Sequence, residues 1–178
     1  MKNVFRIMLA AAMSVAMLAL VACDPEKPDP EQNNPSGDNY TESTSYGIII
    51  DGQTVAAGAT INHVPSATET ENDFASVDML INNKTNDDLP TCLKVELLEG
   101  PDAMERFMMC YGPTCKEGHC PWTSDVFTLV PGINEDMLIK FEYYPSSVTS
   151  KTIYRITVGK GTKLSDPQVI LINAKAGA

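Results

Sequence analysis

Positive charge is scarce in this chain of 178 residues, which has 13 Lys and Arg against 23 Asp and Glu and a formal net charge of −10. Nucleic-acid-binding domains need basic patches that neutralise phosphates, and nothing of that kind is present. The same shortage argues against docking on anionic lipid headgroups through protein charge. We therefore expect no nucleic-acid partner, and any attachment to a membrane has to come from another source.

The motifs of common enzyme classes are missing as well. Only His63 and His119 could act as imidazole bases, and no serine lies in a G-x-S-x-G sequence. The glycine turn at residues 159–162 lacks P-loop spacing, and the acidic pairs at 87–88 and 135–136 lack EF-hand spacing. We therefore expect a protein that is not an enzyme and that carries no cofactor.

Long hydrophobic runs are absent apart from one near the N-terminus. Residues 7–21 carry no charge and follow Lys2 and Arg6, but they are too short to span a hydrocarbon core of about 30 Å. A basic start, a short apolar segment and a small residue before a cleavage site are typical of a secretory signal. We predict a signal peptide at residues 1–22.

The signal ends in Leu20-Val21-Ala22-Cys23, which is a lipobox. At such a site a bacterial prolipoprotein is cut and its new first residue is acylated. Lipid on Cys23 would tether an otherwise soluble protein to a membrane. We predict that Cys23 is the lipidation site and that the lipid is the membrane anchor.

Residues 24–45 contain almost nothing that can be buried, because they are rich in Pro, Asp, Glu, Asn and Ser. We predict that residues 23–45 form the lipidated cysteine and a disordered, extended tether. In enteric bacteria Asp directly after the lipidated cysteine favours the inner membrane. Acidic residues in this region instead resemble the signal that sends Bacteroidota lipoproteins to the cell surface, and a plain solvated linker is the remaining interpretation. We predict an outer-membrane location facing the exterior, with the periplasmic face as the alternative.

Short apolar runs separated by turn residues make up the rest of the chain. Two of them, 93–97 and 137–144, alternate apolar and polar residues as half-buried strands do. No helical crossover separates the runs, and only residues 102–109 could form a brief helix. We predict one all-β domain at residues 46–178, a single immunoglobulin-like antiparallel β-sandwich of about eight or nine strands. The predicted strands lie at residues 46–50, 53–57, 60–64, 74–81, 93–97, 126–130, 137–144, 154–158 and 169–172.

Four cysteines follow Cys23, namely Cys92, Cys110, Cys115 and Cys120. An even number in an exported chain indicates two disulfides, because that compartment is oxidising. Four cysteines allow three connectivities, and spacing alone does not choose among them. A bond between Cys110 and Cys115 across a tight turn is geometrically feasible and would leave Cys92 for Cys120, a longer staple worth about 3 kcal/mol.

Soft metal ligands lie in the same segment, at residues 104–120. Met108, Met109, His119 and the cysteines are residue types that suit Cu(I) or zinc. However, no C-x2-C pair is present, and methionines commonly fill gaps in protein cores. We expect no bound metal. If a metal is bound, Met108, Met109 and His119 are the candidate ligands.

Aromatic residues near the cysteines raise a second possibility. Trp122, Tyr111, Tyr143 and Tyr144 could form a patch that contacts a carbohydrate or a protein partner. The other interpretation is that they are buried in the sandwich, as aromatic residues commonly are.

The order of these features resembles a small β-sandwich found in Bacteroidota. The strand that stops at Asn82-Asn83, the strand at 93–95, and Cys110-Tyr111-Gly112 with Cys115 are similar to those of surface lipoproteins and of proteins sorted by that phylum's own secretion system. In that group a cysteine, an aromatic-Gly pair and a second cysteine form a disulfide-closed loop, which implies the Cys110–Cys115 bond. The resemblance covers residues 47–158, with closing strands at 139–144 and 154–158. Cys92 and the insertion at 117–121 depart from it, and it implies no enzymatic activity.

Together these observations predict a lipid-anchored, surface-exposed, non-enzymatic binding or interaction module. Its partners would be the membrane, through Cys23, and an unidentified protein or glycan. Two alternatives stay open: a soft-metal or haem-handling protein that uses residues 104–120, and an accessory structural subunit of a surface assembly.

Overall fold

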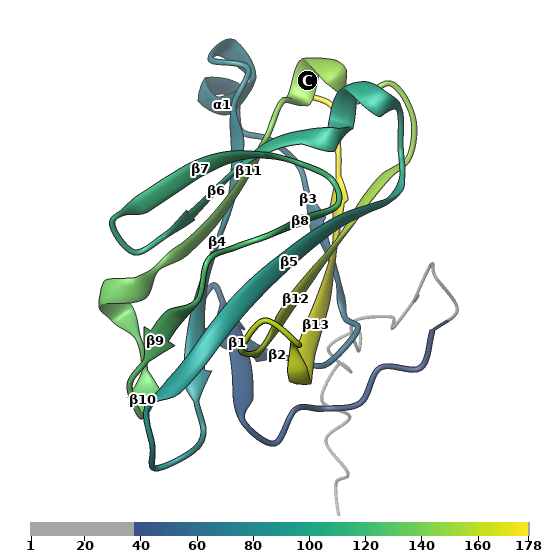
Figure 1. Ribbon diagram of the computed structural model, residues 1–178. Coiled ribbons are helices and arrows are strands. Elements are labelled where there is room, and N and C mark those ends of the chain that lie inside the picture. The colour runs from purple at the N-terminus through teal and green to yellow at the C-terminus, as the bar shows by residue number, and fades with distance from the viewer. Residues whose placement is uncertain (1–37, 178) are drawn as a thin grey trace, which may run out of the picture.

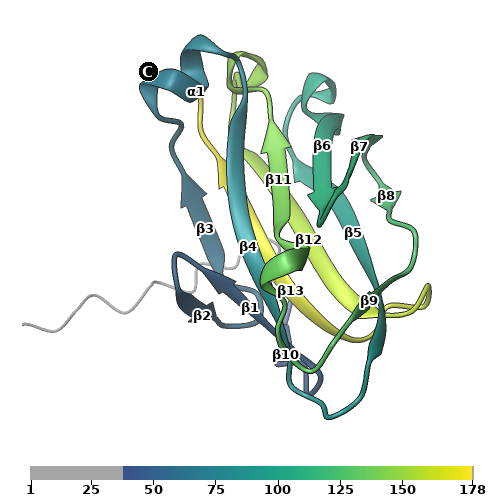
Figure 2. The same ribbon diagram turned by 90° about the vertical axis from the view of Figure 1, so that its left-hand side faces the viewer.

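The computed structural model describes residues 38–177, which form two β-sheets packed face to face (Figures 1 and 2). The first sheet has the order β2-β1-β4-β11-β6-β7, with β10 paired to β4, and the second has the order β3-β13-β12-β5-β8, with β9 paired to β5. The strands are β1 (Tyr46–Ile50), β2 (Gln53–Val55), β3 (Thr60–His63), β4 (Ala75–Asn83), β5 (Leu89–Glu99), β6 (Arg106–Tyr111), β7 (Thr114–His119), β8 (Trp122–Thr123), β9 (Phe127–Leu129), β10 (Gly132–Ile133), β11 (Ile139–Tyr143), β12 (Thr152–Lys160) and β13 (Ser165–Ala174). The predicted all-β sandwich is confirmed.

The strands differ from the prediction in number and in one direction. Residues 38–177 contain 13 strands, of which nine have at least four residues and four have only two or three. The shortest strands, β8 and β10, have two residues each, and the sequence pattern does not predict them. The pairing of β3 with β13 is parallel, whereas all the other pairings are antiparallel. The second sheet is therefore antiparallel except at one edge, where β3 pairs in parallel with β13.

The expected helix at residues 102–109 is wrong in its second half. A short 3-10 helix, η1 (Asp102–Glu105), leads directly into β6, which pairs with β11 on one side and β7 on the other. The apolar run of β6 is stabilised there by two ladders of backbone hydrogen bonds. The only α-helix of the described residues is α1 (Ala67–Glu71), where Ser66 and Glu69 form a capping box. The other two helical turns are η2 (Glu135–Met137) and η3 (Pro145–Ser147).

The inward faces of both sheets form one core. Phe141 lies at its centre, with ring centroids 4.8 Å from Tyr154 and 5.7 Å from Phe107. Two of the buried tyrosines have partners for their hydroxyl groups: the Tyr154 hydroxyl donates to the Met104 carbonyl at 2.6 Å, and Tyr143 Oη lies 3.0 Å from His63 Nδ1. The Tyr111 hydroxyl is buried without a hydrogen-bond partner. Because successive side chains of a strand point to opposite faces of the sheet, the residues between the core positions point outward.

Residues 38–45, which the sequence assigns to the tether, contact the second sheet. The Ser43 backbone N–H donates to Gln168 Oε1 at 3.0 Å, and Ser43 is only 4% exposed. The backbone N–H groups of Thr44 and Ser45 donate to the Asp166 carboxylate at 3.0 and 2.8 Å. We call these hydrogen bonds to Asp166 and Gln168 the entry clamp. Contacts with the sandwich thus begin a few residues before the predicted boundary at Tyr46.

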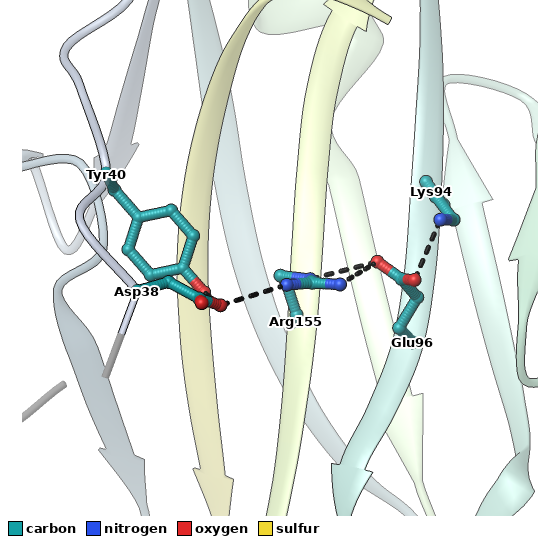
Figure 3. A network of polar contacts seen from close by, with 5 residues as sticks. All are labelled: Asp38, Tyr40, Lys94, Glu96 and Arg155. Carbon is teal, nitrogen blue, oxygen red and sulfur yellow. Dashed lines mark hydrogen bonds and ion pairs between the residues drawn. The ribbon is translucent and has the colours of Figure 1, made fainter. Parts of the chain in front are cut away.

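A charged row crosses the outer face of the second sheet next to the entry clamp (Figure 3). Arg155 on β12 bonds to Glu96 on β5 through Nε and Nη2, at 2.9 and 2.8 Å. Lys94 adds a bond to the same carboxylate at 2.7 Å, and Asp38 lies 3.4 Å from Arg155 on the other side. Burial alone would raise the pKa of Glu96, but the two cations lower it. The row therefore ties the start of the described chain to two strands.

The predicted signal peptide, the lipidation site Cys23 and the acidic residues that follow it lie outside the described residues. Within residues 38–177, no helix has the length and apolar character needed to cross a membrane.

Candidate functional site

The Cys110–Cys115 disulfide is present and closes the β6–β7 hairpin. The two cysteines face each other directly across the hairpin, with their Cα atoms 4.0 Å apart. The turn between the strands contains Gly112 at a φ of +56°, a conformation that glycine adopts without steric cost. This prediction is confirmed, and it places a rigid hairpin beside β11.

The second predicted disulfide is wrong, because Cys92 and Cys120 are both free. Trp122 of β8 lies opposite Val95 of β5, a register that places Cys120 beside Leu97, whose backbone hydrogen-bonds its thiol. Cys92 is five residues back along β5, which is about 16 Å at the rise of a strand. A disulfide needs Cα atoms within about 7 Å.

Neither free thiol is suited to nucleophilic chemistry. Burial raises the pKa of Cys92, and burial raises the pKa of Cys120 to about 12. Both groups therefore stay protonated at neutral pH, and the thiolate is the reactive form.

The proposed soft-metal ligands do not converge. Met109 is buried in the core, whereas Met108, its neighbour on β6, points to the opposite face of the sheet. His119 is exposed at the end of β7, opposite Arg106 and four residues from Cys115. Residues 38–177 contain no group of three or more His, Cys, Asp or Glu placed to hold a metal ion.

The four aromatic residues do not form a shared surface patch either. Tyr111 and Tyr143 are core residues, and the Trp122 ring packs edge-on against Phe107 at 5.7 Å. Tyr144 alone lies on the outer face of the first sheet, where the Arg106 guanidinium sits 5.0 Å above its ring centroid. The interpretation of these residues as buried sandwich aromatics is the better one for three of the four.

An open groove of about 420 Å³ lies on the outer face of the first sheet, and we call it the disulfide groove. It is built by β6 and β11, which pair so that Met108 lies opposite Glu142 and Cys110 lies opposite Lys140. Apolar side chains and the disulfide alternate there with two charged groups. Its lining residues are Phe74, Met108, Cys110, Gly112, Cys115, Leu138, Lys140 and Glu142.

Glu142 is the unusual member of the groove, because it is only 5% exposed on the outward face of a sheet. Its neighbours across the strands are Ser76 and Met108, and its carboxylate makes no hydrogen bond or ion pair within residues 38–177. Burial raises its pKa, Lys140 opposes that rise, and Asp78 adds to it. Lys140 Nζ is 4.0 Å from Asp78, so its charge is shared with another carboxylate.

Sequence reasoning found part of this groove and missed the rest. The disulfide and Met108 were candidates, and the alternation at residues 137–144 correctly separates Leu138, Lys140 and Glu142 from the core side. The burial of Glu142 depends on which strands flank β11. That pairing joins segments at least 28 residues apart, so no local pattern signals it.

A second hollow, of about 400 Å³, lies beside β5 and η1 and contains four acidic residues. Its lining residues are Glu96, Leu97, Leu98, Glu99, Gly100, Asp102, Glu105, Cys120 and Pro121. Glu96 already bonds to Lys94 and Arg155. No carboxylate residue of this hollow is as little exposed as Glu142, so the disulfide groove is the stronger candidate.

Comparison with known proteins finds solved structures of similar fold but no family. No family model matches the chain, and no curated protein matches it. Among solved structures it is similar to the N-terminal domain of PorA, with 12% sequence identity and a TM-score of 0.50, over 75% of this chain and 99% of that one. The likeness is one of fold. A CooA pilin subunit from enterotoxigenic Escherichia coli matches more loosely, with 11% identity and a TM-score of 0.37, over 74% of this chain and 98% of that one.

Proposed function

We propose that this chain is a lipid-anchored, non-enzymatic binding module on the surface of a Gram-negative bacterium, and that the disulfide groove is its contact surface. The observation that carries the proposal is Glu142, a residue that is only 5% exposed and whose carboxylate makes no hydrogen bond or ion pair within residues 38–177. A buried charge without a partner costs folding free energy, so proteins normally pair it. A ligand that brings a hydrogen-bond donor or a cation into the groove would supply the missing partner.

The build of the groove supports a preformed site. Its floor is β11, which is hydrogen-bonded on both sides, to β4 and β6. Its wall is the β6–β7 hairpin, which the disulfide holds closed. Sites built on such elements hold their geometry better than sites on loops.

The position of the chain's entry into the domain supports the same arrangement. The entry clamp and the Asp38–Arg155 contact lie at the second sheet, and Arg155 points away from the core. The disulfide groove lies on the outward face of the first sheet. A lipid on Cys23 and a tether that arrives at the second sheet would therefore leave the groove facing away from the anchor.

Site-specific photo-crosslinking on intact cells tests the proposal. A photoreactive residue at Leu138, which lines the groove, is expected to give adducts with a partner protein or glycan. The matched control is the same residue at Leu98, an exposed apolar position on the second sheet, 37% exposed against 36% for Leu138. Protease added to the intact cells should remove the domain.

Adducts of equal yield from both positions, or none from either, would count against the groove as the contact surface. Adducts that contain only further copies of this chain would favour the alternative of a structural subunit in a surface assembly. Complete protection from added protease would place the domain on the periplasmic side instead.

A further inference from the structure

We infer that the disulfide groove binds the side chain of an arginine presented by a partner polypeptide, with the guanidinium on the Glu142 carboxylate. The inference rests on the proposed function and adds to it the chemistry of the ligand. Three features of the groove carry it: a largely buried glutamate whose carboxylate is unpaired, apolar walls, and an open shape.

The anion selects the charge of the ligand. Glu142 is 95% buried and has no hydrogen-bond or ion-pair partner in residues 38–177, so a cation or strong donor is the group that it lacks. Asp78 and Glu117 lie on the same outward face, opposite Lys140 and Met108 across the strand pairs. An anionic ligand would meet three carboxylates there. The net charge of −10 also draws basic partners toward the molecule.

The cations of this chain near the groove do not already fill that role. Lys140 lies 4.0 Å from Asp78, on the side of β11 away from the hairpin. Arg106 is ion-paired with Glu117 on β7 and stacked over Tyr144. Each has another carboxylate as its partner, which leaves Glu142 for a group from outside.

The walls select a cation on an apolar stem. Phe74, Met108, Leu138 and the disulfide surround the two charged groups. Arginine carries three methylene groups below a flat guanidinium, and such stems pack on apolar surface while the head reaches a charge. Guanidinium also stacks on aromatic rings, binds a carboxylate through two parallel hydrogen bonds, and sheds water more easily than an ammonium group. These properties favour arginine over lysine.

The open shape selects a polypeptide as the carrier. Sites for free small molecules enclose most of the ligand's surface. The disulfide groove instead lies on the outward face of a sheet, so that a side chain can enter while its backbone stays outside. A volume of about 420 Å³ accommodates one long side chain with room for part of a neighbour.

Titration of the full chain, purified in detergent, with short peptides tests the inference. The probes are acetyl-Leu-Arg-Leu-amide and the same peptide with citrulline, a neutral analogue of arginine with nearly the same shape. The reporter is the methyl signal of Met108 in protein labelled with ¹³C at the methionine methyl groups. We expect the arginine peptide to shift that signal and to bind about tenfold or more tightly than the citrulline peptide, because a hydrogen bond to a charged group is worth more than one between neutral groups.

Two matched variants locate the effect. Glu142→Gln removes the proposed partner and is expected to lower the affinity for the arginine peptide about tenfold, to that of the citrulline peptide. Asp51→Asn removes an exposed charge at the turn between β1 and β2, outside the groove, and should change the affinity less than about threefold, since exposed charges interact weakly. Unchanged methyl spectra away from Met108 would show that both variants fold.

The outcomes separate this inference from the proposed function. Equal binding of the two peptides, or equal loss in both variants, overturns the arginine assignment. If Leu138 still gives partner adducts on cells, the groove remains the contact surface and only the ligand chemistry is wrong. A neutral oligosaccharide that shifts Met108 where the arginine peptide does not would also overturn the assignment. Absence of both peptide binding and adducts would remove both proposals.

Discussion

At the scale of single residues, two carboxylates on opposite sides of the sandwich have opposite effects on stability. Glu142 is buried without a partner, and its pKa is raised by that burial. Asp166 accepts hydrogen bonds from Thr44 and Ser45, and they lower its pKa to about 2 although its partial burial acts the other way. The first residue destabilises the charged folded state, and the second stabilises it.

Glu142→Gln should therefore make the folded protein more stable at neutral pH. A carboxyl group whose pKa is raised by folding favours the folded state while it is protonated, and that advantage is lost as the pH rises through its folded pKa. Glutamine stays neutral throughout, so we expect a gain of about 1 kcal/mol at pH 7 and almost none at pH 4. Urea unfolding at the two pH values measures it. A variant less stable than the wild type at pH 7 would mean that the carboxylate has a structural partner.

Asp166→Asn should have the reverse pH dependence. A lowered pKa stabilises the folded state above the ordinary range of an aspartate, and this stabilisation is lost as the pH falls from about 4 toward 2. Asn tolerates the left-handed backbone of this residue, whose φ is +47°, so the change tests the charge and its hydrogen bonds. We expect a loss of about 1 kcal/mol at pH 7, discounted for the partial exposure of the site. Wild type and variant should converge in stability near pH 2.

At the scale of elements, the β6–β7 hairpin is the part that sequence reasoning handled least well. Residues 102–109 were expected to be helical, because the apolar run Phe107–Tyr111 has no alternation to read. β7 is polar along most of its length, as an exposed edge strand can be. Strands β4, β5, β11, β12 and β13 were predictable because their inner faces carry apolar residues at every second position, or continuously. The pairing of the hairpin with β11 creates the disulfide groove, and that pairing is not encoded locally.

The cysteine state of this region gives a direct measurement. Acid-quenched, unfolded protein carrying Cys23→Ala should show two titratable thiols per chain, Cys92 and Cys120, since Cys110 and Cys115 are bonded. The same reagent should react slowly with the folded protein, because Cys92 is buried and the pKa of Cys120 is about 12. A count of zero would restore the second disulfide, and a count of four would remove the first.

The double variant Cys110→Ala/Cys115→Ala tests what the disulfide contributes to the hairpin. The bond closes a short loop, so its removal should cost about 2 kcal/mol by the loop-entropy model. The arginine peptide should also bind less tightly, because one wall of the groove is lost. Cys92→Ala is the matched control, since it changes a buried cysteine of the other sheet and leaves the groove intact.

At the scale of the whole molecule, the proposed anchor and the proposed contact surface are separate parts that can be tested separately. Cys23→Ala should abolish incorporation of labelled palmitate and release the protein from membranes. It should leave the thermal unfolding of the domain and its peptide binding unchanged, because the core and the disulfide groove are built from residues between Tyr46 and Ala174. Membrane association that survives this change would mean that another segment holds the protein there.

The position of β13 determines when the second sheet can form. This strand is the last one in sequence order, yet it lies between β3 and β12 and pairs with both. A chain that has emerged only as far as residue 164 can pair β12 with β5, but β3 has no strand to pair with. The hydrogen bonds of the entry clamp cannot form either, because Asp166 and Gln168 have not yet emerged. The domain therefore cannot complete its fold during synthesis until nearly all of it is available. For the exported lipoprotein that we propose, such a delay would favour an unfolded chain while it is threaded through the membrane.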